Sequence, residues 1–116
     1  MRNDKPNIIV DKVIEFSVLV INYCETLERQ RKFVLANQLL RAGTSIGANV
    51  FEAQNAESKA DFIHKMKIAA SEASETRYWL ILCERTLFEF DHTLKIKLEE
   101  IIKILSRIIS STRQLT

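Results

Sequence analysis

The chain has 116 residues, of which 47% are hydrophobic and 28% are charged, and 17 Lys and Arg against 15 Asp and Glu give a formal charge of +2. This length suits one domain, and two glycines and one proline are too few for the turns of a β-rich fold. The charge is mild for a nucleic-acid binder, although a symmetric oligomer would multiply it. With no secretory leader and no run of 18 apolar residues, we expect a cytoplasmic protein without a membrane partner.

The first expected element is a helix over about residues 8–29. Apolar side chains recur there in alternating steps of four and three residues, which is the period of one helix face. This face consists of Ile9, Val13, Phe16, Val20, Tyr23 and Leu27. The charged stretch from 28 to 32 contains no apolar residue and is therefore the expected turn.

This turn carries three cations close together, Arg29, Arg31 and Lys32. In an oligomer they would form a charged rim repeated at one end of each bundle, and they are our candidate contact to the phosphate backbone of nucleic acid. The alternative is that the turn is simply solvated, with Glu28 compensating part of the charge. The residues alone favour this second interpretation slightly.

The second expected helix covers about residues 32–55 and contains both glycines of the chain, Gly43 and Gly47. A glycine inside a helix costs roughly 1 kcal/mol relative to alanine, and glycines four residues apart lie on the same side. Close approach of another helix would offset this cost. Apolar residues also cover more of this helix than one core can use, so we assign Gly43 and Gly47 to a contact between subunits.

Polar residues occupy a narrow stripe of the same helix, formed mainly by Arg41, Ser45, Asn49 and Glu52. These side chains could form a catalytic cluster, but no histidine accompanies Ser45 within the helix. A structural polar network that ties this helix to the third helix or to a neighbouring subunit explains the stripe better. Arginine and glutamate on one stripe can satisfy each other's hydrogen bonds.

The third expected helix covers about residues 59–88, and Ser58 with Asp61 three residues later resembles the capping box that precedes a helix. Beside its core stripe the helix carries three more apolar side chains on one flank, namely Ile68, Trp79 and Leu82. A tryptophan among aliphatic residues and carboxylates is typical of an interface anchor. We therefore assign these three residues to the subunit interface, with packing of Trp79 under a loop as the alternative.

Arg77 falls on the apolar side of this helix, close to the small residues of its core stripe. A buried guanidinium must be paired. The expected partners are Glu84, two turns along the same helix, or Glu52 on the second helix. We interpret the arginine as part of a buried salt bridge that specifies packing, and a ligand-binding arginine is the alternative.

The fourth expected helix covers about residues 92–113, with Asp91 as its N-cap. Its apolar stripe is Leu94, Leu98, Ile101, Leu105, Ile108 and Thr112. Short connections place successive long helices antiparallel, so we predict an all-α, antiparallel up-down-up-down four-helix bundle that forms a single domain over residues 1–116. Cys24 and Cys83 both lie on apolar faces, and we expect buried free thiols in a reducing compartment.

Metal and nucleophile chemistry find little support in the residues. Bundles that hold two metal ions use Glu-x-x-His pairs on facing helices, and the chain contains Asp61-x-x-His64 and Glu89-x-x-His92. However, His64 projects away from the core stripe, and Glu89 and His92 straddle a turn. There is no nucleophile elbow and no Walker-type phosphate loop. We expect no metal, no cofactor and no enzymatic activity.

Several stretches of the sequence resemble a bacterial family of four-helix bundles encoded in intervening sequences of 23S ribosomal RNA genes, namely residues 38–49, 52–53, 61–66 and 72–80. The most specific part is Arg-x-x-Thr-Ser-Ile-x-Ala-Asn at 41–49, and the resemblance covers nearly the whole chain. It implies ring-like homopentamers. It also implies association with nucleic acid, because that family is similar in fold and assembly to the accessory protein of diversity-generating retroelements, which binds nucleic acid and a reverse transcriptase. That relative is strongly basic, unlike this chain.

These observations together predict a non-enzymatic homopentamer assembled through the second and third helices, with RNA or DNA as the expected partner. The alternative is a protein-protein adaptor without nucleic-acid affinity. The two interpretations differ in one measurable property, which is salt-dependent binding to phosphate backbones.

Overall fold

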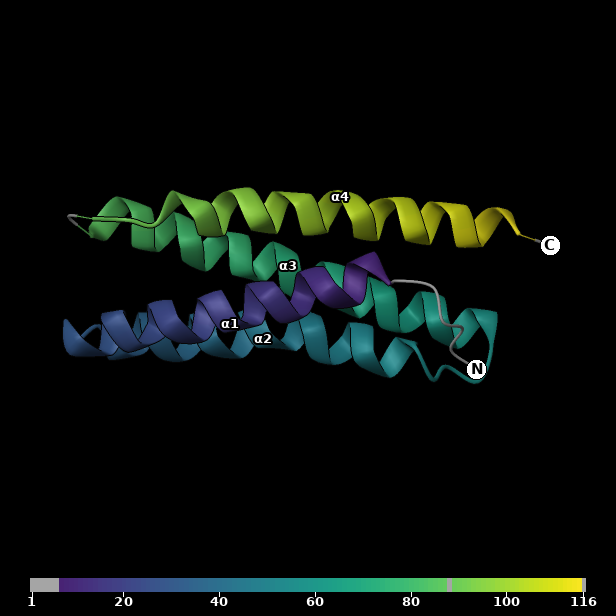
Figure 1. Cartoon of the computed structure of the whole chain (residues 1–116), viewed down its shortest axis with the longest axis horizontal. Coiled ribbons are helices and arrows are strands. Elements are labelled where there is room, and N and C mark those ends of the chain that lie inside the picture. The colour runs from purple at the N-terminus through teal and green to yellow at the C-terminus, as the bar shows by residue number, and fades with distance from the viewer. Residues whose placement is uncertain (1–6, 88, 116) are drawn as a thin grey trace.

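The structure, a computed structural model, describes residues 7–87 and 89–115. Four helices make up this part of the chain: α1 (Ile8–Arg29), α2 (Phe33–Ala53), α3 (Lys59–Thr86) and α4 (His92–Gln114). Each helix packs antiparallel against the next one, and α4 closes the bundle against α1 (Figure 1). The predicted all-α, up-down-up-down four-helix bundle is confirmed. None of these described helices has the continuous apolar length that a bilayer crossing requires.

The two ends of the bundle differ in what they contain (Figure 1). The α1–α2 turn and the α3–α4 connection lie together at one end, which we call the turn end. At the other end α1 begins, α2 leads into α3, and α4 finishes, so we call it the terminal end.

Polar side chains fix the starts of α3 and α4. Ser58 Oγ accepts a hydrogen bond from the Asp61 backbone N–H at 3.0 Å, and the Asp61 carboxylate accepts from the Glu57 N–H at 3.1 Å. Asp91 accepts from the Thr93 N–H at 3.0 Å. The two N-caps expected from the sequence are therefore present, and they satisfy backbone donors that the helices leave free.

Two helices are shorter than the sequence indicates. α2 ends at Ala53, because the N–H groups of residues 54–56 bond to carbonyls three residues back and the α-helical ladder stops there. α3 ends at Thr86, because Leu87 is extended with φ −105° and ψ 145°. Position 88 of the expected third helix lies outside the described residues.

The core follows the predicted apolar stripes. Its largest fully buried side chains are Phe16, Leu27, Leu39, Ile46, Met66, Leu80, Leu94, Leu98, Ile101 and Leu105. Cys24 and Cys83 are free and buried within it. In the described chain no Cα of α1 lies within 8 Å of a Cα of α3, a separation beyond the reach of a disulfide. Burial raises the pKa of Cys24 to about 12 and that of Cys83 to about 11.

Both glycines face α1 of the same chain. A Cβ added at Gly43 would lie 3.0 Å from Val20 Cγ1, and one added at Gly47 would lie 3.3 Å from Ser17 Oγ. The close helix approach expected from the glycines is therefore made by α1 of the same chain at Gly43, whereas Gly47 also borders a groove that is open to solvent. The distribution of apolar and small residues around α2 shows that another helix must pack against it. It does not show which helix that is.

Candidate subunit and nucleic-acid interfaces

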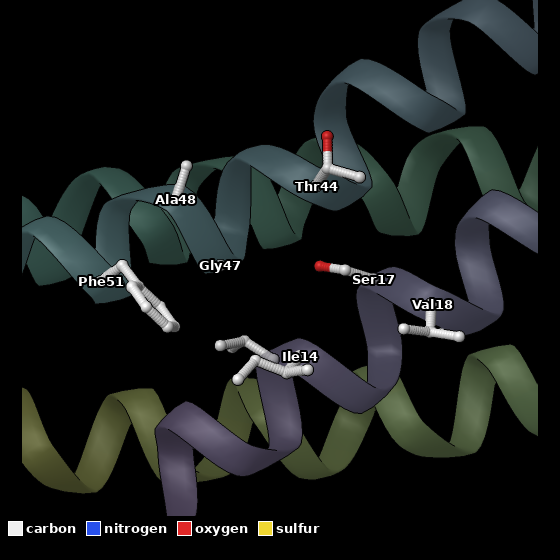
Figure 2. A pocket seen from close by; sticks show the side chains of 8 residues that line it. Ile14, Ser17, Val18, Thr44, Gly47, Ala48 and Phe51 are labelled. Atoms are coloured by element: carbon white, nitrogen blue, oxygen red, sulfur yellow. The ribbon is translucent and has the colours of Figure 1, made fainter.

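An uncharged groove of about 230 Å³ runs between α1 and α2 on their solvent side (Figure 2). It is lined by Val13, Ile14, Ser17 and Val18 from α1 and by Thr44, Gly47, Ala48 and Phe51 from α2. Figure 2 shows the Phe51 ring pointing toward Ile14 across one end of the groove. Gly47 borders this hollow, and a Cβ added there would contact Ser17 and Val13 of α1.

Exposed apolar side chains continue this groove along both helices. Ile14, Val18 and Ile21 of α1 are 46%, 50% and 44% exposed, and Leu40 and Phe51 of α2 are 38% and 49% exposed. Large apolar groups that are exposed together mark interaction sites, whereas isolated ones need no explanation. We call these five residues together with the groove the apolar α1/α2 face. The α1 half of this face is not expected from the sequence as interpreted above, although Ile14, Val18 and Ile21 follow the steps of four and three residues that mark one helix face.

The three apolar residues on the flank of α3, Ile68, Trp79 and Leu82, are only half-exposed. Trp79 packs against the edge of the core, and its Nε1 donates to Glu75 at 2.9 Å. The Tyr78 ring meets the Trp79 ring edge-on, with the centroids 5.1 Å apart. α3 therefore exposes less apolar surface on this flank than the sequence indicates, and most of the more exposed aliphatic side chains lie on α1 and α2.

The expected polar network between the second and third helices is present only in part. Arg41 of α2 forms ion pairs with two glutamates of α3, Glu72 at 3.7 Å and Glu75. Ser45 and Asn49 do not join this network, because their side chains donate to backbone carbonyls one turn back within α2. Glu52 makes no ion pair with another described residue.

Arg77 is not buried, which contradicts the expectation from the sequence. Its side chain is 43% exposed, and its Nε and Nη2 donate to the two carboxylate oxygens of Glu99 on α4 at 2.8 and 2.7 Å. An arginine at the edge of a core can carry its guanidinium outward along its aliphatic stem. This hydrogen-bonded pair lowers the pKa of Glu99. The expected partner Glu84 accepts instead from Lys95 of α4 at 2.9 Å.

The candidate rim lies at the turn end, and its cations Arg29, Arg31 and Lys32 are all exposed. Arg31 has a φ of 63°, and no other described non-glycine residue has a positive φ. The N–H of Arg31 bonds to the Glu28 carbonyl and that of Lys32 to the Leu27 carbonyl, each at 2.9 Å. This is the Schellman arrangement, in which glycine is the usual residue. A side chain in this conformation costs about 1 kcal/mol.

The residues that imitate a metal site are dispersed. Asp61 accepts from Lys65 at 2.9 Å, and His64 is exposed on α3 near the terminal end. His92 lies at the turn end, with its Nδ1 3.6 Å from Glu84 Oε2. Within residues 7–87 and 89–115, no group of three or more His, Cys, Asp or Glu is placed to hold a metal ion.

Two comparisons with known proteins find relatives of this bundle. A family model described as 23S rRNA-intervening sequence protein matches residues 5–111. Among solved structures, a protein with unknown function from the S23 ribosomal protein family of Bacteroides thetaiotaomicron is 45% identical, with a TM-score of 0.83. That alignment covers 87% of this chain and 97% of the other. A comparison with curated proteins gives no match.

Proposed function

Since this chain belongs to the family of 23S rRNA-intervening sequence proteins, we propose that it is a non-enzymatic, homopentameric scaffold that binds nucleic acid. The observation that carries the proposal is the apolar α1/α2 face, whose groove contains no charged residue. Assembly through this face would repeat the exposed cations of each chain around a ring, which raises the local density of positive charge. The family name records the location of the genes in intervening sequences of 23S ribosomal RNA genes, so it does not choose between RNA and DNA as the partner.

The apolar α1/α2 face suits a contact between two copies of the chain. Burying a half-exposed aliphatic or aromatic side chain contributes about 1 kcal/mol, so its five large residues contribute roughly 5 kcal/mol per contact. A cyclic pentamer uses a head-to-tail contact, in which this face meets a different surface of the next chain. The α3 flank with Ile68, Trp79 and Leu82 is our candidate for that second surface, because part of each side chain is still exposed.

Size-exclusion chromatography with light scattering tests the assembly. We expect the wild-type protein to elute with five times the chain mass and Val18→Glu to dissociate, because a carboxylate would be buried in the contact. Val34→Glu is the matched control, since Val34 is 74% exposed and lies outside the apolar α1/α2 face. A monomeric wild type at micromolar concentration would overturn the assembly. A pentameric Val18→Glu protein would overturn the choice of face.

Nucleic-acid binding is supported at the rim by the conformation of Arg31. A glycine would fit its left-handed backbone without cost, so the arginine side chain weakens the fold locally, as residues at binding sites often do. Arg29 and Lys32 extend the cationic surface on either side. Contacts of this kind are directed at phosphates and weaken steeply with salt.

Filter binding with an RNA hairpin, measured over a salt series, tests this part of the proposal. We expect Arg31→Glu to weaken binding and Arg31→Lys to retain most of it, because phosphate contacts depend mainly on charge. Absence of wild-type binding at about 50 mM salt would overturn nucleic-acid binding.

A protein-protein adaptor is the second candidate, because a partner protein could cover the same apolar α1/α2 face. A monomeric wild type that binds no RNA or DNA would favour this adaptor. Pull-down followed by nuclease treatment separates the two functions, since only a protein-mediated complex survives the nuclease.

A further inference from the structure

The two halves of α4 differ in how their charges are satisfied. In the first half, the lysines and glutamates pair with side chains of α1 and α3: Lys95 with Glu84, Lys97 with Glu15, Glu99 with Arg77 and Glu100 with Lys12. These pairs link α4 to the rest of the bundle. The charges of the first half are therefore explained by packing.

The second half of α4, residues 101–114, contains three cations and no carboxylate. Lys103, Arg107 and Arg113 are exposed, and none of them makes an ion pair with another residue of the described chain. Arg113 lies in the last turn, where the helix dipole favours a cation. Lys103 lies one turn after Glu99 and helps to lower the pKa of that carboxyl, but neither Lys103 nor Arg107 forms an ion pair with a described residue, so both can contact a partner. We call residues 101–114 the basic half of α4.

The two central cations lie on one side of the helix. Lys103 and Arg107 are one turn apart, so about 6 Å separates them along the axis, which is close to the distance between adjacent phosphates of one strand. Lys59 at the start of α3 donates to the Leu115 carbonyl and thereby brings a further cation to this end. The terminal end thus gathers positive charge from two helices.

The surroundings of these cations suit phosphates better than lipid. The other exposed polar residues of the basic half carry hydroxyl or amide groups, namely Ser106, Ser110, Ser111 and Gln114. Such groups donate to phosphate oxygens in nucleic-acid complexes. No large hydrophobic residue of 101–114 is among the exposed ones, whereas a helix that lies on a membrane needs an exposed apolar face.

The rim at the turn end is more balanced in charge. Exposed carboxylates accompany its three cations there, from Glu25 and Glu28 of α1 and from Glu89 and Asp91 of the α3–α4 connection. Each of them weakens the attraction of that end for a polyanion. The basic half of α4 has no carboxylate of its own, and of the carboxylates that other segments bring to the terminal end, Asp61 is paired with Lys65 whereas Asp11 and Glu57 are exposed.

We infer that the basic half of α4 binds the phosphodiester backbone of nucleic acid, with Lys103 and Arg107 as the central contacts and Arg113 and Lys59 at the margin. This inference rests on the proposed nucleic-acid-binding function and adds to the rim a second surface, which makes the stronger contact. α4 lies diagonally opposite α2, since none of their described Cα atoms approach within 8 Å. The outer side of α4 therefore remains accessible when the apolar α1/α2 face is covered.

Fluorescence anisotropy with a labelled RNA hairpin of about 20 nucleotides, repeated with a DNA duplex of the same sequence, tests the assignment. The test variant is Lys103→Glu/Arg107→Glu. The matched control is Arg29→Glu/Lys32→Glu at the rim, which changes the net charge by the same amount. We expect the α4 variant to weaken binding at least about tenfold at about 50 mM salt and the rim variant to weaken it less. Lys103→Gln/Arg107→Gln should lower the salt slope by about 1.5. Circular dichroism establishes that each variant is folded.

The outcomes separate the surface from the function. Wild-type binding that survives Lys103→Glu/Arg107→Glu, or that both double variants weaken equally, overturns the assignment to α4 and leaves the proposed function standing. Absence of wild-type binding to both probes overturns both. A preference for RNA over DNA identifies the source of the backbone without changing the surface. Binding to anionic phosphatidylserine vesicles that the RNA hairpin does not displace would overturn the inference in favour of a lipid headgroup.

Discussion

Gly43 and Gly47 offer a paired test of helix packing, because the structure gives these two positions different amounts of room. A Cβ at Gly43 would lie 3.0 and 3.1 Å from the two Cγ atoms of Val20, which is fully buried. A β-branched side chain in a helix has one strongly preferred rotamer, so Val20 cannot turn away. A Cβ at Gly47 would lie 3.3 Å from Ser17 Oγ. That hydroxyl borders the groove and can rotate into it.

The two alanine substitutions should therefore have opposite signs. Alanine is favoured over glycine in a helix interior by about 1 kcal/mol. At Gly47 little opposes this gain, so we expect Gly47→Ala to raise the free energy of unfolding by about 0.5–1 kcal/mol and the Tm by about 3 °C. At Gly43 overpacking against Val20 costs about 1–3 kcal/mol, so the net effect of Gly43→Ala is a loss of up to about 2 kcal/mol. Gly43→Leu should cost still more.

Urea unfolding followed by circular dichroism at 222 nm measures both effects. The protein concentration is held constant, because self-assembly would add a concentration-dependent contribution to the stability. Val20→Ala in the Gly43→Ala background is the control, since removing both Cγ atoms relieves the clash and should reduce the penalty of the added methyl group. If Gly43→Ala stabilises the protein as much as Gly47→Ala does, the contact with Val20 is not tight and the reasoning is wrong.

Four further predictions concern other parts of the molecule. Arg31→Gly should raise the free energy of unfolding by about 1 kcal/mol, because glycine fits the φ of 63°; Arg29→Gly, inside α1, should lower it by a similar amount in the same urea experiment. Arg77 holds the pKa of Glu99 below its ordinary value through its hydrogen bonds, so this pair stabilises the fold above the unfolded-state pKa and loses its contribution as the pH falls through the folded-state value. In Glu99→Gln the free energy of unfolding should fall less between neutral and acidic pH than in the wild type. The difference should be less than about 1 kcal/mol, because both side chains are partly solvated. Ellman's reagent at about pH 8 should modify Cys24 and Cys83 only after unfolding, since burial raises both thiol pKa values; rapid reaction of the native protein would contradict their burial. Elemental analysis of the purified protein should find no stoichiometric iron, manganese or zinc, and one or two ions per chain would contradict a bundle without a metal centre.

The helices could be predicted from the sequence because their information is local. The steps of four and three residues that place Val13, Phe16 and Val20 on one face, and caps such as Ser58, depend only on neighbours in the chain. The identity of the helix that approaches Gly43 cannot be predicted from neighbouring residues in the chain. It depends on the register of α1 against α2, which the wheel of a single helix does not contain.

The partners of charged side chains were harder to predict for the same reason. Arg77 reaches Glu99 only because α3 and α4 align at one particular height, and its long stem allows the guanidinium to leave the core edge. The absence of carboxylates after Glu100, in contrast, can be read directly from the sequence. What the sequence could not show is that the earlier charges of α4 are all used by neighbouring helices.

The ion pairs also divide the bundle mechanically. They connect α2 with α3, α3 with α4, and α4 with α1, whereas none of those found among the described residues joins α1 to α2. High salt screens exposed charges but does not weaken apolar burial, so raised ionic strength should weaken the contacts of α4 slightly more than the contact between α1 and α2, while the buried leucines of α4 keep it docked. Native-state hydrogen exchange would then show the amides of α4 losing protection before those of α2. The fourth helix is thus held to the bundle by its buried side chains, and its ion pairs only adjust how often its backbone opens.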